Sequence, residues 1–446
     1  MRRNKIDIIS LGCSKNLVDS EHLMRQLQAA GYQVAHNASR VDGEIVVVNT
    51  CGFIADAQQE SIDTILRLGE AKREGKIRNL IVMGCLSERF RADLTEALPE
   101  VDRMYGKFDW KGMLADLGHA YRDDLAHERC LTTPSHYCYL KISEGCNRFC
   151  AFCAIPLITG RHTSVPMQQL LDEVHRLADS GVKEFNVIAQ DLSSYGMDLE
   201  GRMMLPELID RMADIDGVEW IRLHYAYPTQ FPYDILPVMA SHDNVCSYLD
   251  IALQHISDKV LANMRRHIGR QETLDQLARL RREVPGIHIR TTLMVGFPGE
   301  GDQEFEELMD FTREARFERM GAFAYSEEAG TWAAENLSDD IPQEVKQERL
   351  QQLMALQEEI SLEIQEQKVG QTLRVIVDRE DEDYYVGRTQ WDSPEVDPEV
   401  LIQKNKPLKV GEFAQVHIEQ ALPFELIGRG IKSLQYPHTQ SPIQDR

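Results

Sequence analysis

Three cysteines in one short run are the residues of this chain with the clearest capacity for chemistry. Cys146, Cys150 and Cys153 have CxxxCxxC spacing within Glu144-Gly-Cys-Asn-Arg-Phe-Cys-Ala-Phe-Cys-Ala-Ile-Pro156. An iron–sulfur cube normally takes four protein thiolates, and this run supplies three. The remaining iron would stay open, so that it could bind and cleave a small molecule. The spacing therefore predicts a reactive four-iron four-sulfur cluster.

Two other uses of these thiols remain open. A structural zinc site would need four Cys or His ligands, often in CxxC pairs, and no matching second pair lies nearby. A disulfide with one spare thiol is less favoured, because the chain has nine cysteines, an odd number, and no export signal. Those features indicate reduced thiols and a cytoplasmic location.

The composition indicates a multidomain globular protein. The 446 residues exceed one ordinary domain, so two or three domains are expected. No stretch approaches the ~18 apolar residues of a membrane span, so no membrane partner is expected. A net charge of −23 favours a basic protein partner or a small substrate over free RNA, although a local basic groove is compatible with it.

Residues 1–130 read as alternating strands and helices, and three of the strands end beside a glycine and a cysteine, namely Cys13, Cys51 and Cys85. Continuous apolar strands separated by helices indicate an open parallel sheet with helices on its faces. Ligands gather at the carboxyl ends of such strands, so the three thiols could converge. Three small buried side chains are the alternative. The expected strands are Lys5–Leu11, Glu44–Val48 and Asn79–Met83, and the expected helices are Asp19–Ala30 and Ala57–Glu74.

Residues 135–368 form a second expected domain, with strand and helix in strict turn. It is too short for an eight-fold barrel, so a partial (β/α) barrel is expected, with chemistry at the carboxyl ends of the strands. A long amphipathic helix over residues 342–368 completes it. The expected strands are Lys183–Ala189, Trp220–His224, Tyr248–Leu253, His288–Val295 and Arg319–Ala324.

Residues 370–436 show short alternating strands, which predict a small all-β barrel of OB-like size. The whole chain is thus expected to be α/β with a β-barrel at its C-terminal end. The expected strands of the barrel are Thr372–Val377, Tyr384–Arg388, Phe413–Ile418 and Leu426–Ile431.

The order of these features resembles that of the radical S-adenosylmethionine (SAM) methylthiotransferases, over nearly the whole chain. The resemblance implies that the open iron of the CxxxCxxC cluster binds SAM, which one electron from flavodoxin or ferredoxin cleaves to a 5′-deoxyadenosyl radical. It also implies a second four-iron four-sulfur cluster on Cys13, Cys51 and Cys85, which would carry the sulfur to be transferred. The C-terminal barrel would be a TRAM domain that grips the substrate.

Local motifs favour one of the two main branches of this family. One branch modifies an isopentenyl-adenosine base of tRNA. The other modifies the β-carbon of an aspartate in the twelfth small-subunit ribosomal protein, and Ser10-Leu-Gly-Cys-Ser-Lys-Asn-Leu-Val-Asp-Ser-Glu21 is similar to its first block. Further matching runs are Tyr139-Leu-Lys-Ile-Ser-Glu-Gly-Cys-Asn147, Gln190-Asp-Leu-Ser-Ser-Tyr-Gly196, Leu223-His-Tyr225 and Val295-Gly-Phe-Pro-Gly-Glu300.

The charge of the C-terminal barrel favours the same branch. Residues 371–434 contain twelve Asp or Glu and eight Lys or Arg, with a dense acidic run over residues 380–383. A barrel that grips tRNA should be basic, whereas an acidic one suits a strongly basic ribosomal protein, free or within the ribosome. A solvated acidic loop is the alternative for the run itself.

Two strand ends and the cluster loop supply candidate SAM contacts. Gln190 and Asp191, at the end of one strand, could bond the amino group or the ribose of SAM. The loop that contains Gly296 and Gly299, at the end of a later strand, could stack on adenine. The glycine spacing is not that of a dinucleotide-binding loop, and turn or packing roles are the alternative for each position. The candidates are Gln190 and Asp191, then Gly296, Pro298 and Gly299, with Phe152 in the cluster loop.

Four positions depart from the family pattern. Thr159 and Val165 replace usual arginines, and Ser14 and Ala252 replace usual prolines. The arginines would lie just past the cluster loop, where positive charge could hold SAM or the substrate carboxylate. Two other functions therefore stay open: a tRNA methylthiotransferase with a basic barrel, and a non-catalytic iron–sulfur protein that binds the ribosome. The remaining cysteines and two histidines are expected to pack or hydrogen-bond; they are Cys130, Cys138, Cys246, His224 and His255.

Overall fold

The computed structural model describes residues 2–431 and divides the chain into two compact units. One unit runs to Gln357 and the other begins at Glu358. Residues 432–436, the end of the expected C-terminal barrel domain, lie outside the described residues. Within residues 2–431, every helix is too short or too polar to cross a membrane.

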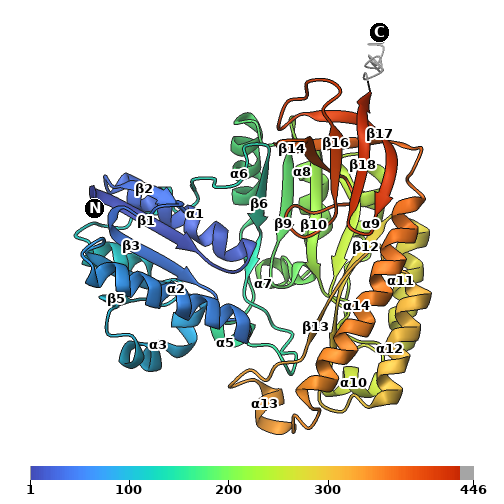
Figure 1. Cartoon of the computed structure of the whole chain (residues 1–446), viewed down its shortest axis with the longest axis horizontal. Coiled ribbons are helices and arrows are strands. Elements are labelled where there is room, and N and C mark those ends of the chain that lie inside the picture. Colours follow the sequence, from blue (N-terminus) through green and yellow to red (C-terminus); the bar gives the residue numbers. More distant parts are fainter. Residues whose placement is uncertain (1, 432–446) are drawn as a thin grey trace. The chain divides into compact units, whose positions relative to one another are not determined.

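The first sheet has five parallel strands in the order β2-β1-β3-β4-β5 (Figure 1). Alternate residues of β3 face opposite sides, so that Ile45 and Val47 enter one core while Val46 and Val48 enter the other. Helices α1 and α4 cover the first core, and α2 and α3 cover the second. The elements are β1 Arg2–Ser10, α1 Ser14–Ala29, β2 Gln33–His36, β3 Gly43–Thr50, α2 Ala55–Arg73, β4 Asn79–Gly84, α3 Cys85–Ala97, β5 Arg103–Met104, α4 Trp110–Asp116 and the 3-10 turn Asp123–Leu125.

Two details of this sheet differ from expectation. Helix α1 begins at Ser14, directly after Cys13, rather than at Asp19, because its polar first turn gave no apolar signal. Strands β2 and β5 were not expected, since short edge strands carry little hydrophobic alternation.

The second sheet has six parallel strands in the order β13-β12-β11-β10-β9-β6, which confirms the partial barrel. One face is apolar and packs against α6, α8, α9, α11 and α12. The other face is polar yet buried, and it includes Glu184, Asn186, Arg222, His224 and Asp250. A polar face that is shielded from bulk water is a suitable wall for a reaction cavity.

The elements of this second sheet and its surroundings include several short pieces beside the main strands and helices. They are β6 Tyr137–Lys141, β7 Ser143–Glu144, α5 Ile155–Thr159, β8 Thr163–Ser164, α6 Met167–Asp179, β9 Glu184–Ile188, the 3-10 turn Leu192–Ser194, α7 Met197–Glu200, α8 Leu205–Ala213, β10 Trp220–Ala226, α9 Ile235–Ser241, β11 Val245–Ile251, α10 Asp258–Asn263, α11 Arg270–Glu283, β12 His288–Val295, α12 Asp302–Ala315, β13 Arg319–Ala324 and α13 Trp332–Asn336.

A long helix and a closed five-stranded barrel follow. Helix α14, Gln343–Glu366, contains the division between the two units. The barrel closes in the order β14-β15-β16-β18-β17 around a small apolar core. Strand β16 was not expected, because it follows the Pro- and Asp-containing segment 391–398. The strands are β14 Thr372–Glu380, β15 Tyr384–Thr389, β16 Glu399–Gln403, β17 Phe413–Leu422 and β18 Glu425–Ile431.

Candidate functional site

Three cysteines meet at the carboxyl edge of the first sheet. Cys13, Cys51 and Cys85 follow β1, β3 and β4, which are hydrogen-bonded neighbours with Thr50 opposite Gly84. A Cβ placed on Gly12, whose φ is +87°, would lie 2.8 Å from Cys51 Sγ. Burial, helped by the charges of Cys13 and Cys51, raises the pKa of Cys85 to about 12. The sheet therefore brings together three thiols that are far apart in the sequence.

The CxxxCxxC loop forms a second group of thiols in the same unit, between β7 and α5. Burial raises the pKa of the Cys146 thiol to about 12, with a contribution from Cys150. Burial also raises the pKa of Cys153, and the charges of Cys150 and Cys146 act in the same direction. These mutual effects show that the three sulfurs are close in space.

Cys150 has two polar neighbours from later parts of the chain. Arg266 Nη1 donates to Cys150 Sγ at 3.2 Å, and the Tyr227 hydroxyl lies 3.4 Å from the same sulfur. The guanidinium of Arg266 also stacks over the Tyr227 ring at 4.1 Å. Cys150 Sγ therefore lies beside a guanidinium and a phenol hydroxyl, the kind of neighbours that orient a metal ligand.

Both groups of cysteines fit an iron–sulfur cluster by their chemistry. Each supplies three thiolates and no oxygen ligand, a donor set that suits iron–sulfur clusters rather than Mg²⁺ or Ca²⁺. In the described range, no three His, Cys, Asp or Glu side chains are grouped as ligands of one metal ion. A cube spreads its thiolates over separate irons, so its ligands surround a larger centre than a single ion.

A buried network of charges joins the two groups of cysteines. Lys107, which follows the first sheet, lies 3.3 Å from Asp19 Oδ2 and 3.1 Å from Glu144 Oε1. Lys141 of β6 contacts the same two carboxylates, at 2.7 Å from Glu144 Oε2. Burial alone would raise the pKa of Glu144, but Lys141 and Lys107 outweigh it and lower the pKa to about 2. Glu144 lies two residues before Cys146, and Lys107 is near enough to Cys85 to lower that thiol's pKa.

The predicted SAM contacts at the end of β9 are engaged with neighbours. Gln190 Nε2 donates to Glu144 Oε1, while Gln190 Oε1 is buried without a donor among the described residues. Asp191 accepts from Arg148 Nε at 2.7 Å and from the Ser193 backbone N–H at 3.0 Å. Gln190 Oε1 is thus free to accept a hydrogen bond from a ligand, whereas the Asp191 carboxylate is already bound to Arg148. Their contacts with SAM stay a prediction.

The predicted adenine loop follows β12. Gly296 donates its N–H to Glu300 Oε1 at 2.9 Å, and Pro298 O accepts from Asn263 Nδ2 at 3.1 Å. Gly299 has a φ of +95°, a conformation that glycine adopts without strain. Phe152 packs edge to face with Phe297 of this loop, with ring centroids 6.2 Å apart. The cluster loop and the glycine loop therefore touch, although their contact with SAM is also untested.

The two positions that lack the family's usual arginines have structural partners. Thr159 ends α5 and donates to Ile155 O at 3.1 Å, and Val165 packs against the large core. Positive charge near the cluster loop comes instead from Arg148 and Arg266. Arg148 belongs to the loop itself and Arg266 to a distant segment. The loop therefore has cations although the family's usual arginines are missing.

The other cysteines and histidines occupy buried or hydrogen-bonded positions. His224 Nε2 lies 3.3 Å from Asn186 Oδ1, and His255 Nε2 lies 3.2 Å from Glu300 Oε2. Burial lowers the pKa of His224, so its neutral form is favoured. The three remaining cysteines are half-buried or buried; they are Cys130, Cys138 and Cys246.

A basic pocket of about 520 Å³ opens beside the cluster loop. Its lining includes Arg148, Arg265 and His267, together with the half-exposed Phe149. Phe149, Gln230, Arg265 and His267 all have φ between 50° and 57°, a conformation that non-glycine residues adopt rarely. Such backbone strain tends to gather at functional sites, so this pocket is a candidate part of the site.

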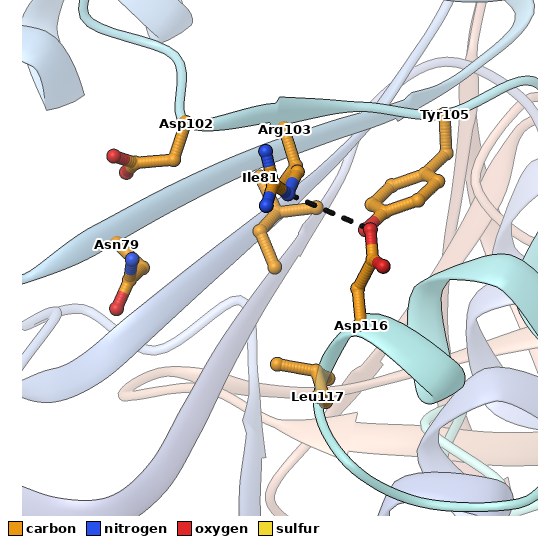
Figure 2. A pocket seen from close by; sticks show the side chains of 7 residues that line it. All are labelled: Asn79, Ile81, Asp102, Arg103, Tyr105, Asp116 and Leu117. Carbon is orange, nitrogen blue, oxygen red and sulfur yellow. Dashed lines mark hydrogen bonds and ion pairs between the residues drawn. The ribbon is translucent and has the colours of Figure 1, made fainter.

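Another pocket has a volume of about 320 Å³. Figure 2 shows the side chains that line it. The Tyr105 hydroxyl donates to Asp116 Oδ2 at 2.6 Å, and Arg103 approaches the same carboxylate at 3.5 Å. Asn79, which lines the pocket, begins β4, whereas Cys85 follows the last residue of that strand. This pocket is therefore separate from the cysteine edge of the sheet.

Sequence reasoning missed several residues of the site. Tyr227 and Arg266 reach Cys150 only through the fold, as Lys107 reaches Glu144, and no local motif marks these three residues. Arg148 stands inside the CxxxCxxC run, where its position could have identified it. Glu144 did carry a signal, because it stands two residues before Cys146.

Three family models match successive parts of the chain. The first is described as uncharacterized protein family UPF0004 and matches residues 5–106; the radical SAM superfamily matches residues 140–312, and the TRAM domain matches residues 369–431. Similar proteins include three described as ribosomal protein uS12 methylthiotransferase RimO, from Parabacteroides distasonis, Phocaeicola vulgatus and Bacteroides fragilis. They are 63%, 60% and 59% identical to this chain, and each match covers 96% of it and 99% of the relative.

Solved structures with the same kind of fold are more distant in sequence. The radical SAM methyltransferase TsrM from Kitasatospora setae has a TM-score of 0.53 at 13% identity, over 72% of each chain. The cobalamin-dependent radical enzyme OxsB has a TM-score of 0.51 at 12% identity, over 79% of this chain and 56% of OxsB. At these identities the likeness shows the fold alone.

Proposed function

Since the chain belongs to the RimO family of radical SAM methylthiotransferases, we propose that it attaches a methylthio group to the β-carbon of an aspartate in ribosomal protein uS12. The observation that carries this proposal is the buried network of Asp19, Lys107 and Glu144, which connects two groups of three thiols within one compact unit. Two centres that act on one substrate must open onto one space, and a shared network supports that arrangement.

The thiols fit two clusters with different tasks. Cys146, Cys150 and Cys153 would hold the cluster that binds SAM, and the three cysteines of the first sheet would hold the second cluster. When bound, SAM and the clusters would supply the hydrogen-abstracting radical and the transferred sulfur. This chain's residues position these groups and keep water out.

Named residues around the SAM cluster have distinct supporting roles. Arg266 and Tyr227 would orient the sulfur of Cys150 as an iron ligand, because both reach it. Gln190 Oε1 would accept from the amino group of SAM, since it is buried and without a donor. Gly296, Pro298 and Gly299 would offer a flat backbone surface to adenine, and Phe152 would hold the cluster loop against it.

The C-terminal barrel would bind the basic substrate protein. The acidic run over residues 380–383 includes Glu382 and Asp383, which are exposed and have no side-chain partner among the described residues. Exposed carboxylates attract a basic protein and repel RNA phosphates. We therefore place uS12, rather than free tRNA, on this barrel, with the reaction in the cytoplasm.

An acidic electron carrier would reduce the SAM cluster. The pocket beside the cluster loop carries Arg148, Arg265 and His267 in a chain whose net charge is −23. A local cationic surface favours an anionic partner such as flavodoxin or ferredoxin, and the half-exposed Phe149 within the loop offers a short path to the cluster.

The test is an anaerobic assay of the protein reconstituted with iron and sulfide. SAM, dithionite and recombinant uS12 are added, and uS12 is examined by mass spectrometry for one aspartate that carries methylthio in place of hydrogen. Loss of the product in Cys13→Ala and in Cys150→Ala, with Cys246→Ala retaining it, would support the proposal. Formation of 5′-deoxyadenosine without modified uS12 would exclude this substrate, and tRNA would then be assayed. Absence of both would favour a non-catalytic ribosome-binding protein.

A further inference from the structure

Lys15 is a buried lysine that has no anionic partner among residues 2–431. Its side chain belongs to a residue that is 9% exposed, and its Nζ lies 3.0 Å from the centroid of the Tyr225 ring. In the described part of the same unit, the other buried lysines, Lys107 and Lys346, are each bound to a carboxylate. No hydrogen-bond acceptor or carboxylate of residues 2–431 binds Lys15. A buried ammonium without a counter-charge is unfavourable, so a bound anion would stabilise it.

The position of Lys15 places this cation at the centre of the site. It stands two residues after Cys13, in the first turn of α1. Cys13 gives this helix no side-chain cap and the first turn holds no acidic residue, so its backbone N–H groups also favour an anion. Tyr225 lies near the carboxyl end of β10, the edge of the second sheet where chemistry is expected.

Tyr225 is held in a conformation that presents its ring to Lys15. Its φ is +63°, which is uncommon for an aromatic residue. Tyr225 packs against an apolar cluster that joins Val18 of α1 to residues of β6 and β9, so the two sheets' edges meet at this point. The contact therefore fixes the ammonium between the cysteines of the first sheet and the polar face of the second.

Asp250 is the carboxylate near Lys15, but it forms no ion pair with it among the described residues. Asp250 Oδ2 lies 3.9 Å from His224 Nδ1 and 3.7 Å from Arg290 Nη1. Burial alone would raise the pKa of Asp250, but the hydrogen bond from His224 and the charges of Arg290 and Lys15 outweigh it and lower the pKa. Asp250 thus stays ionised and is held by Arg290 and by the ring of His224, which leaves Lys15 available to an external carboxylate.

We infer that Lys15 and the open N-terminus of α1 bind the side-chain carboxylate of the target aspartate. This inference rests on the proposed function. The carboxylate carbon is bonded directly to the β-carbon, so holding the carboxylate places the reacting atom beside the second cluster. Lys15 is then the residue that distinguishes aspartate from asparagine, whose neutral amide would leave the ammonium unpaired.

Binding of uS12 tests the inference independently of turnover. The reconstituted wild type and Lys15→Met are titrated with uS12 that carries either Asp or Asn at the modified position. We expect the wild type to prefer Asp by about 10- to 100-fold, as for a charge-assisted hydrogen bond, and Lys15→Met to lose this preference. Lys76→Met removes an exposed lysine elsewhere and should keep it. Tyr225→Phe preserves the ring and should also keep it. An unchanged preference in Lys15→Met overturns the inference.

Two further measurements separate other roles of Lys15. Lys15→Met should cleave SAM at the wild-type rate in the absence of uS12; a loss of that cleavage assigns Lys15 to the SAM carboxylate and overturns the inference. The apoprotein of Lys15→Met should melt no lower than the wild type, because an unpaired buried charge is removed. A lower melting temperature indicates a structural role and also overturns it.

The same experiment distinguishes the inference from the proposed function. If the wild type modifies uS12 while Lys15→Met keeps the preference for Asp, only the role of Lys15 fails. If the wild type neither modifies uS12 nor prefers Asp over Asn, the proposed function fails and the inference fails with it.

Discussion

The ammonium nitrogen of Lys107 lies 3.1 Å from Glu144 Oε1, and this ion pair ties the first sheet to the loop that carries Cys146. The side chain of Lys107 is 3% exposed and also reaches Asp19, so the ammonium group is shielded from water. Burial alone would lower the pKa of Lys107, but Asp19 and Glu144 outweigh it and raise the pKa. The two carboxylates therefore favour the charged form of this buried lysine.

Lys107→Met should destabilise the first unit strongly. It would leave two buried carboxylates with one lysine between them, and breaking such a pair typically costs about 3 kcal/mol or more of unfolding free energy. Urea denaturation of the apoprotein measures this loss. Lys111→Met, which removes a lysine that is 70% exposed, is the matched control and should leave the midpoint unchanged. Equal midpoints for the two variants would show that the network does not support the fold.

The six predicted ligands should divide into two independent sets. Single Ala variants of the first-sheet cysteines should each lose about half of the iron of the reconstituted protein, and so should variants of the CxxxCxxC loop, because each cube holds half of the total. Iron analysis and EPR of the reduced protein would show which cluster remains. Cys246→Ala changes a buried cysteine outside both sets and should keep all the iron. Full iron in Cys51→Ala would exclude the second cluster.

Arg266 should tune the SAM cluster. A buried positive charge that donates to a cluster sulfur favours the reduced form, so Arg266→Gln should shift the reduction potential to a more negative value. A redox titration monitored by EPR measures the shift. Arg265→Gln is a close control, since Arg265 stacks on Trp332 at 3.8 Å and no bond from it to a sulfur is present among the described residues. If the reduction potential is unaffected by Arg266→Gln but altered by Arg265→Gln, the prediction is wrong and Arg265 is the arginine that sets the potential.

The acidic run of the barrel should bind uS12 electrostatically. The double variant Glu382→Gln/Asp383→Asn should weaken binding severalfold at low salt, and the difference should shrink at high salt, because exposed charges are screened. Binding isotherms at two ionic strengths measure both effects. Asp93→Asn/Glu96→Gln removes the same charge from exposed positions of α3 and should change binding less. If both double variants weaken binding equally, net charge rather than this run is responsible.

His22 should make the stability of the apoprotein depend on pH. Burial, helped by the charge of Arg129, lowers the pKa of His22 from 6.5 to about 4. His22 is therefore protonated near pH 6.5 in the unfolded chain but only near pH 4 in the folded chain. Stability from this group is complete above pH 6.5 and is lost as the pH falls through that interval.

Thermal melting at a series of pH values checks the role of His22. The midpoint of the wild type should fall between pH 6.5 and pH 4, and His22→Phe should fall less over the same interval. Phenylalanine keeps a ring beside Trp110, with which His22 stacks at 6.3 Å, so packing is largely preserved. Identical pH profiles for the two proteins would show that another group is responsible.

The sequence predicted most of the helices and strands but missed several short strands and the start of one helix. The strands His288–Val295 and Arg319–Ala324 occur as expected, because continuous apolar runs identify buried parallel strands. Strands β2, β5 and β16 are short and flanked by polar residues, so their pairing depends on neighbours that the local pattern does not contain. The start of α1 was placed too late for the same reason, since the helix begins with polar residues.

The sequence by itself determined which thiols are available as ligands and the order of the three domains along the chain. Ligand spacing and hydrophobic periodicity, on which these predictions depend, are local properties of a chain. The tertiary structure alone decided which distant residues meet. Arg266 reaches Cys150 across 116 positions of sequence, and Lys107 reaches Glu144 across 37. Lys15 faces Tyr225 only because α1 and β10 belong to adjoining sheet edges. These contacts follow from the order of strands within each sheet, and that order is fixed by long-range packing rather than by any local pattern of residues.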